Sequence, residues 1–199
     1  MRILLDCSPA KIMEYRARYG HDFGQLRTPL TTYARCPGVE YALDNGCFKR
    51  FEKATWLRMV QDTDEDPPLF ITLPDIVGDA ARTVELFDAF WHRCNGVRLA
   101  LVLQDGIENV RIPWDRIHAI FIGGSTEFKH SREAFAAARA AKMLDKWVHV
   151  GRVNTDKRVR NWVGLADSID GSGMSRFDDR LDEVLKELAG EHPQKAMAL

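Results

Sequence analysis

The chain has 199 residues, which is enough for one domain with a large core and too few for two domains of usual size. Hydrophobic residues make up 45% and charged residues 29%, as in an ordinary soluble globular protein. The formal net charge of −1 excludes an overall basic field that would attract nucleic acid, so any such contact has to come from a local cluster.

Short apolar runs alternate with helical patterns along the chain. Most of the runs are continuous in hydrophobicity, as expected for strands that are buried on both faces. They cover residues 2–6, 40–44, 69–75, 97–104, 118–124, 147–151 and 167–170. Apolar residues at helical spacing predict helices over 79–94, 131–145, 155–166 and 176–190.

This alternation predicts a parallel α/β fold, and both a doubly wound sheet and a (β/α) barrel fit it. No GxGxxG or GxxxxGK[ST] motif follows the first strand, which is unfavourable for a Rossmann or P-loop protein. We therefore predict a TIM-type (β/α)8 barrel that is compact or partly degenerate, with its eighth strand inside 21–34. Residues 1–190 are expected to form this single catalytic domain, and residues 191–199 a flexible tail.

Polar residues or glycines follow most of the predicted strands directly. Because the carboxyl ends of parallel strands line the active site of such folds, these positions predict one functional cleft. A single aspartate after a strand is usually a cap or turn residue, but several carboxylates in one cleft repel one another unless a ligand or a proton offsets them. The rim positions are Asp44, Asp75, Gln104, Gly123, Gly124, His149, Gly151 and Asp170.

The rim residues favour glycosidic chemistry. No GxSxG motif supports a Ser-His-Asp triad, and a lone histidine such as His149 is as often structural as catalytic. Cys47 lies near the rim, but a small buried thiol is the simpler interpretation. Paired carboxylates remain, and in glycosidases one of them attacks or stabilises an anomeric carbon while the other transfers a proton.

The cysteines and the start of the chain indicate the compartment. The four cysteines show neither a CxxC pair nor a histidine at zinc-finger spacing, so we expect no metal site. The opening "MRILLDCSPAK" has too short an apolar run for a signal peptide, and no stretch reaches the roughly 20 apolar residues of a membrane span. A cytoplasmic protein with reduced thiols and no membrane contact is therefore expected.

Six segments at the strand ends match, in the same order, motifs of one enzyme family. "ALDNGCFKRF" is similar to "TDSGGFQVFS", "LPDIVGD" to "SDIVMAFDE", and "LVLQDG" to "GIVQGG". "FIGGS" resembles "AIGGLA", "VHVGRVNT" resembles "LMGVGTP", and "DSIDGSGMSR" resembles "DMFDCVLPTR". The family is that of the tRNA-guanine transglycosylases (queuine tRNA-ribosyltransferases), and the resemblance covers roughly residues 40–178.

The resemblance implies a (β/α)8 barrel and a base-exchange activity. Guanine is removed from a nucleotide, and a 7-deazaguanine is installed in its place. By this resemblance Asp170 is the nucleophile that attacks the sugar C1′, and Asp44 is the general acid/base that deprotonates the incoming base. Asp75 accepts hydrogen bonds from N1–H and the exocyclic amine of the base.

The remaining rim residues are expected to complete the base pocket. Gln104 and the backbone of Gly123 or Gly124 would hold the O6 atom, and His149 and Gly151 are also expected to contact the substrate. A guanine edge offers two donors beside one acceptor, which a carboxylate and an amide donor match.

Gly171 and Gly173, directly after the expected nucleophile, are predicted to let a sugar-phosphate approach it closely.

The chain also departs from the family. The tRNA enzymes carry a zinc site of three cysteines and one histidine after the nucleophile, whereas no cysteine follows Cys94 here. The chain is also far shorter, and so it looks more like the reduced, phage-type relatives that insert a 7-deazaguanine (preQ0-like) into DNA. The implied partners are guanine-containing DNA and a free 7-deazaguanine base, with no cofactor, in the host cytoplasm if the protein is phage-encoded. A partner protein and the oligomeric state are left open.

A local basic cluster follows the sixth predicted strand. Such a run is most often a solvated helix face, but its closeness to the rim predicts contacts with nucleic-acid phosphates and a strong salt dependence. A base inside a duplex would have to be extruded to reach the site. The predicted phosphate contacts are Arg152, Lys157, Arg158, Arg160 and Arg176.

Other functions fit the same residues. The chain could be a tRNA-guanine transglycosylase, or a base-exchange enzyme or hydrolase that acts on free nucleosides or nucleotides. It could also be a non-catalytic barrel that only binds a purine or a nucleic acid.

Overall fold

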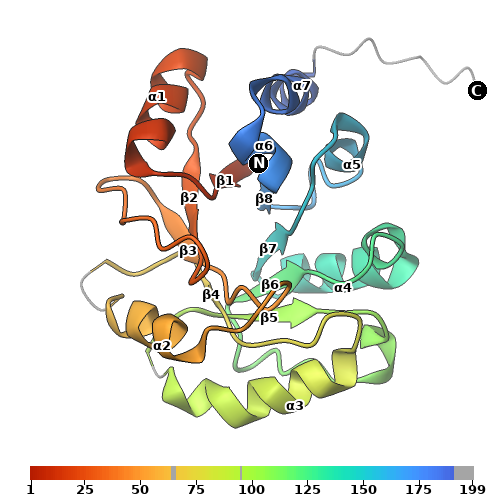
Figure 1. Ribbon diagram of the computed structural model, residues 1–199. Helices are drawn as coiled ribbons and strands as arrows, with labels where there is room; N and C mark the ends of the chain where they lie inside the picture. The colour runs from red at the N-terminus through yellow and green to blue at the C-terminus, as the bar shows by residue number, and fades with distance from the viewer. Residues whose placement is uncertain (64–65, 95, 191–199) are drawn as a thin grey trace, which may run out of the picture.

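The computed structural model describes residues 1–63, 66–94 and 96–190, and the predicted tail 191–199 lies outside these residues. Eight parallel strands close into a barrel in chain order, which confirms the predicted (β/α)8 architecture (Figure 1). Closure is made by β1 and β8, where Ile3 pairs with Ile169. The strands are β1 (Arg2–Leu5), β2 (Gly24–Arg27), β3 (Tyr41–Leu43), β4 (Ile71–Thr72), β5 (Leu99–Leu103), β6 (Ala119–Ile122), β7 (Trp147–Val150) and β8 (Ser168–Asp170).

The eighth strand that the sequence pattern left unlocated is β2, which lies inside the expected segment 21–34. Its sequence, "GQLR", contains one large apolar residue, so it shows no strand pattern by itself. A Cβ atom on Gly24 would lie 2.5 Å from Leu4 Cδ2, so glycine allows β2 to pack against β1. The strand is thus specified by its neighbours more than by its own propensity.

The helices are α1 (Pro9–Tyr19), α2 (Lys53–Gln61), α3 (Ala80–Phe90), α4 (Arg132–Met143), α5 (Asp156–Arg160), α6 (Ser172–Arg176) and α7 (Asp178–Leu188). The sequence patterns missed α1 and α2, and the predicted helix 176–190 begins with α7 at Asp178. The predicted helix 155–166 is shorter than expected, because α5 ends at Arg160. Within the described chain no α-helix links β2 to β3 or β5 to β6, so the barrel is partly degenerate as predicted.

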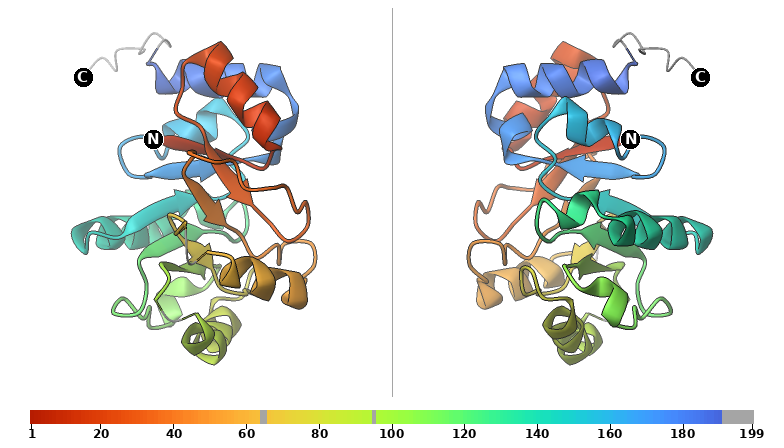
Figure 2. Two further views of the ribbon diagram at one scale, coloured as in Figure 1. Left: turned by 90° about the vertical axis from the view of Figure 1, so that its left-hand side faces the viewer. Right: turned by 90° about the vertical axis from the view of Figure 1, so that its right-hand side faces the viewer.

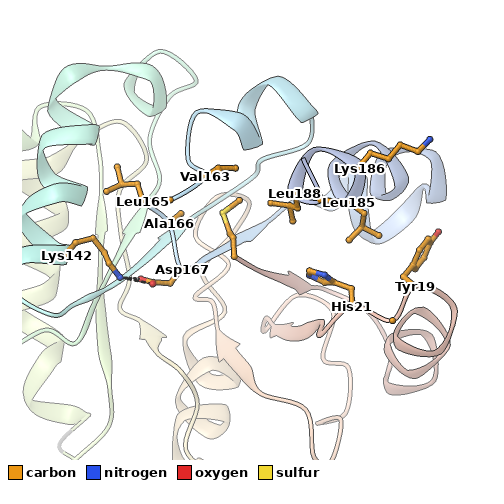
Figure 3. Close-up of a pocket in the computed structure, with 14 residues that line it drawn as sticks. Tyr19, His21, Lys142, Val163, Leu165, Ala166, Asp167, Leu185, Lys186 and Leu188 are labelled. Atoms are coloured by element: carbon orange, nitrogen blue, oxygen red, sulfur yellow. Dashed lines mark hydrogen bonds and ion pairs between the residues drawn. The ribbon is translucent and has the colours of Figure 1, made fainter. Parts of the chain in front are cut away.

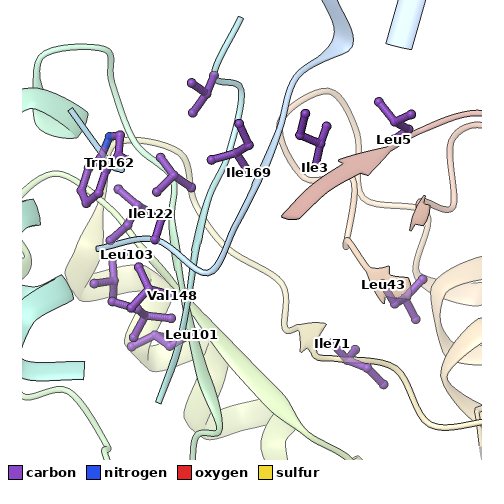
Figure 4. Close-up of a cluster of buried hydrophobic side chains, with 14 of the residues drawn as sticks. Ile3, Leu5, Leu43, Ile71, Leu101, Leu103, Ile122, Val148, Trp162 and Ile169 are labelled. Carbon is purple, nitrogen blue, oxygen red and sulfur yellow. The ribbon is translucent and has the colours of Figure 1, made fainter. Parts of the chain in front are cut away.

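Strand alternation divides the apolar core into two layers. Outward residues such as Leu101, Leu103 and Ile122 pack against the helices in the larger cluster (Figure 4). The inward residues form a smaller cluster inside the barrel, made of Leu4, Leu26, Ala42, Phe70, Ala100, Val102, Ala119 and Phe121. Because side chains alternate along a strand, the next inward positions beyond this cluster lie at the carboxyl mouth of the barrel.

The first and last helices of the described chain meet beside this barrel. Helices α1 and α7 lie side by side (Figure 2), and the Tyr15 hydroxyl donates a hydrogen bond to Asp178 Oδ1 at 2.6 Å. This contact adds to the β1–β8 pairing that closes the barrel.

Residues 28–40 connect β2 to β3 without a helix, and one buried side chain organises this connection. Gln25 Nε2 donates hydrogen bonds to the carbonyl oxygens of Ala34 at 2.8 Å and Cys7 at 3.2 Å. Gln25 Oε1 accepts a hydrogen bond from the Cys36 backbone N–H at 2.9 Å. Since Gln25, Cys7 and Cys36 are all buried, the backbone groups of the two cysteines have little access to water as an alternative partner.

We therefore expect Gln25→Leu to lower the free energy of unfolding by about 1–3 kcal/mol, because it leaves buried backbone groups unpaired. Hydrogen exchange at the Cys36 amide should accelerate in the same variant. The control is Gln61→Leu at the exposed end of α2, which should change stability by less than about 0.5 kcal/mol. Equal effects of the two substitutions in chemical denaturation would contradict this account.

Candidate active site

A cavity opens at the carboxyl ends of the strands, where the sequence places its polar residues. Its lining contains Asp44, Asp75, Gln104, Gly123, Gly124, Gly151 and Asp170, which are all but one of the predicted catalytic and base-binding residues. The exception is His149. The lining is completed by Leu26, Asn45, Phe48, Val77, Val102, Phe121, Lys129 and Arg152. Strand ends from β2 to β8 therefore contribute to one space.

Glycines keep this space open at two of the inward positions. A Cβ atom on Gly151 would lie 2.4 Å from Phe121 Cε1, and one on Gly123 would lie 2.7 Å from Val102 Cγ1. Only glycine fits directly above these bulky inner residues, so the cavity floor is made by backbone at β6 and β7.

Asp170 is buried at the end of β8 and is held at both oxygens. Its Oδ1 accepts a hydrogen bond from the Arg152 backbone N–H at 3.0 Å, and its Oδ2 lies 2.9 Å from His149 Nε2. Two fixed donors orient the carboxylate, and each oxygen keeps lone-pair capacity toward the cavity.

His149 lies fully buried behind Asp170 and does not line the cavity, which differs from its expected contact with the substrate. Its ring is packed against Phe70 and Phe121, with centroid distances of 5.1 and 4.5 Å. Ser168 Oγ lies 2.8 Å from His149 Nδ1 and accepts a hydrogen bond from Trp147 Nε1 at 2.8 Å.

These contacts engage both ring nitrogens of His149. Because an ionised carboxylate only accepts hydrogen bonds, Nε2 carries the hydrogen that faces Asp170. His149 is therefore a positioning residue for the Asp170 carboxylate.

Asp44, the other expected catalytic residue, follows β3 and lines the same cavity. Burial raises the pKa of its carboxyl group to about 7, and the nearby charges of Asp170 and Asp75 add to this shift. Its oxygens accept only long hydrogen bonds, from Thr72 Oγ1 and from the Gly46 backbone N–H, both at 3.3 Å. A carboxyl group with this pKa can both give and take a proton near neutral pH.

Asp75 lines the same cavity and is held by amide donors. Asn45 Nδ2 donates to Asp75 Oδ1 at 2.8 Å, and Gln104 Nε2 donates to Asp75 Oδ2 at 2.5 Å. Burial raises the pKa of Asp75, and these hydrogen bonds act in the opposite direction. Gln104 is itself fixed, because its Oε1 accepts from the Gly78 backbone N–H at 2.9 Å.

The sequence analysis missed several residues of the cavity. Asn45 and Phe48 lie inside the quoted segment "ALDNGCFKRF", but neither was singled out, although Asn45 directly follows a catalytic candidate and supports Asp75. Lys129 carries no motif, and only the fold brings it to the rim.

The structure separates the predicted phosphate contacts into two groups. Arg152 lines the cavity, and Arg158 lines a recess beside it. Arg160 instead pairs with Glu187 of α7, with Nε and Nη2 donating at 2.8 and 2.7 Å. Lys157 and Arg176 are exposed and line neither space.

Gly171 and Gly173 also have a different use from the one expected. A Cβ atom on Gly171 would lie 2.4 Å from Asn154 Oδ1, and the Gly173 backbone N–H donates to the same oxygen at 2.8 Å. The glycines let the loop after β7 pack against the start of α6. They do not line the cavity.

A larger groove lies at the opposite pole, beside the amino ends of β1 and β8 (Figure 3). It is lined by apolar residues such as Leu165 and Leu188 and by the ion pair of Lys142 with Asp167. It contains none of the rim residues. Active sites of this fold lie at the carboxyl end of the strands, so the smaller cavity is the candidate active site.

Two further observations concern metals and membranes. Among the residues that the structure describes, no group of three or more His, Cys, Asp or Glu side chains is arranged to hold a metal ion. None of the described helices is long and apolar enough to span a bilayer.

No model of a known protein family matches the chain, and a search of curated proteins found no match. The resemblance to the transglycosylases therefore depends on the sequence motifs alone.

The raised pKa of Asp44 gives a stability test. The folded pKa lies above the unfolded one, so the contribution of Asp44 to stability should fall as the pH rises from about 4 to about 7. Asp44→Asn removes this loss. The free energy of unfolding of the variant minus that of wild type should therefore be more positive at pH 8 than at pH 4.

Urea denaturation at both pH values measures this gain. Asp115→Asn, at an exposed position, is the control and should show nearly the same difference from wild type at both. If Asp44→Asn behaves like this control, the assignment of the raised pKa is wrong.

Proposed function

We propose that the chain is a transglycosylase that exchanges guanine for a 7-deazaguanine in DNA through a covalent intermediate on Asp170. The observation that carries this proposal is that Asp170 and Asp44 line one cavity, with the Asp75–Gln104 pair beside them. A nucleophilic carboxylate, a second carboxyl group able to hold a proton, and a polar edge for a purine are the three parts that base exchange needs.

In the first half-reaction an Asp170 oxygen attacks C1′ of the deoxyribose, and the bond from C1′ to N9 of guanine breaks. Asp44, protonated near neutral pH because of its raised pKa, supplies a proton to the leaving base. In the second half-reaction Asp44 takes the N9 proton of the incoming base, N9 attacks C1′, and the ester to Asp170 breaks. The enzyme returns to its starting protonation state.

The cavity offers groups for the edge of the base. Asp75 accepts two protein hydrogen bonds, and a carboxylate has further lone pairs for the N1–H and amine donors of guanine. Gln104 donates one N–H to Asp75, so its second N–H is free for O6. The Gly123 N–H is committed to the Leu103 carbonyl at 3.0 Å, so the Gly124 N–H is the better backbone candidate.

His149 supports the nucleophile in this scheme. The Nε2–H of His149 donates to Asp170 and orients its carboxylate toward the cavity. The covalent ester forms at the oxygen that faces C1′, while the other oxygen keeps its donor.

The direct test uses mass spectrometry of nucleosides. DNA, tRNA and free deoxyguanosine are each incubated with the protein and a 7-deazaguanine base, and the products are digested and analysed. We expect the 7-deazaguanine nucleoside from DNA, and at least about a 10³-fold loss of this product for Asp170→Asn.

Asp79→Asn is the control, because asparagine caps α3 as well as aspartate does and the position lies outside the cavity. Product from free deoxyguanosine alone would favour an enzyme of small substrates, and product from tRNA alone would favour a tRNA-guanine transglycosylase. No product from any of the three substrates would contradict the proposal and favour a barrel that only binds.

A further inference from the structure

A second recess adjoins the candidate active site, between the loops that follow β6 and β7. Its polar lining comes from Lys129, Arg152, Arg158, Asn154 and Ser125. The recess shares several lining residues with the main cavity, so the two spaces are continuous.

The three cations of this recess form no ion pair among the described residues, although the charge of Asp170 acts on Lys129. The recess is lined by no Asp or Glu. Within the described part of the chain, no carboxylate lies within ion-pair distance of Lys129, Arg152 or Arg158. Asp105, which lies after β5, accepts hydrogen bonds from the backbone N–H and the hydroxyl of Ser125. Three unpaired cations around one recess favour an anionic ligand.

The charged form of Lys129 is destabilised in the free protein. It is partly buried, and this burial lowers the pKa of its ammonium to about 8. The charge of Asp170 acts against this shift, and the charges of Arg152 and Arg158 act with it. A partly buried cation without an ion-pair partner is stabilised when an anion binds beside it.

Arg152 connects this recess to the reaction centre. Its backbone N–H donates to Asp170, and its guanidinium lies over the Phe48 ring at 3.5 Å from the centroid. Its φ of 59° is a left-handed conformation that costs a non-glycine residue about 1 kcal/mol or more. The turn thus places one residue against both the nucleophile and the recess.

Asn154 adds a neutral donor on the same wall. Its Oδ1 accepts a hydrogen bond from the Gly173 N–H, which leaves its Nδ2 as the polar group without a backbone partner. A tetrahedral anion with several acceptor oxygens matches such a set of donors.

We propose that this basic recess, formed by Lys129, Arg152 and Arg158, binds the backbone phosphate next to the deoxyribose whose C1′ faces Asp170. The identity of that sugar rests on the proposed function. The recess makes the site selective for a guanine inside a DNA strand over a free nucleoside, because only the strand carries the phosphate. Lys129 and Arg152 line both spaces, so the expected phosphate position adjoins the expected sugar position.

Binding of short ligands tests the recess without any exchange reaction. The probes are free deoxyguanosine, a trinucleotide with a central deoxyguanosine, and the same trinucleotide with uncharged methylphosphonates on both sides of the guanine. We expect wild-type protein to bind the charged trinucleotide at least about tenfold more tightly than the uncharged one in calorimetric titration at low salt.

Lys129→Gln and Arg158→Gln should each lose about tenfold in affinity for the charged trinucleotide and keep their affinity for the uncharged one. Lys142→Gln, at the opposite pole, is the control with the same loss of charge and should match wild type. Thermal melting checks that all variants are folded.

The inference is overturned if wild type does not prefer the charged trinucleotide, or if Lys129→Gln retains that preference in full. Equal losses for charged and uncharged ligands would also overturn it, because they would indicate a structural effect. These outcomes are separate from failure of the proposed function, which is measured by base exchange: the charge preference can hold without exchange, and exchange can occur without it.

Discussion

A closed barrel of short parallel strands lets only alternate residues point inward, and the rest of the site depends on this constraint. The inner layer ends at residues such as Val102 and Phe121, so the next inward position on each strand is the first one at the mouth. Those positions carry Asp44, Gln104, Gly123, Gly151 and Asp170. On each of these strands the polar or glycine residue at the mouth therefore lies two positions after an inward buried residue, and this spacing brings the candidate catalytic groups into one cavity.

The same constraint crowds three carboxylates into one small space, and each is stabilised in a different way. Asp44 retains a proton up to about pH 7, Asp75 accepts amide hydrogen bonds, and Asp170 is held by a histidine and a backbone N–H. Different environments push neighbouring carboxyl groups toward different protonation states, and this is how an acid and a nucleophile can coexist. The basic recess beyond Arg152 places opposite charge next to this acidic centre.

Much of this could be predicted from the sequence, because each inward polar residue directly extends a strand pattern. In "LALVLQ", for example, the alternation that buries Val102 also places Gln104 at the rim. The role of His149 could not be predicted, since it depends on the register between β7 and β8, which aligns it with Ser168. The place of Lys129 depends on a short turn of 3-10 helix after β6 that has no motif.

Helical spacing divides the predicted basic cluster. Arg158 and Arg160 are two residues apart on α5, so they cannot face the same side of a helix. Arg158 lines the recess, and Arg160 turns to Glu187 on α7. Gly171 and Gly173 were misjudged for another reason: their neighbour Asn154 comes from a different loop, which no local pattern reveals.

The central claim is that Asp170 forms a covalent bond to the sugar of a guanine nucleotide. The most direct measurement is intact-protein mass spectrometry after incubation with guanine-containing DNA and acid quenching, followed by peptide mapping. The account predicts a mass increase equal to the abasic DNA fragment on the peptide that contains Asp170. This adduct should disappear when a 7-deazaguanine base is added before the acid quench. No adduct under conditions that support exchange, or an adduct on any other residue, would contradict it.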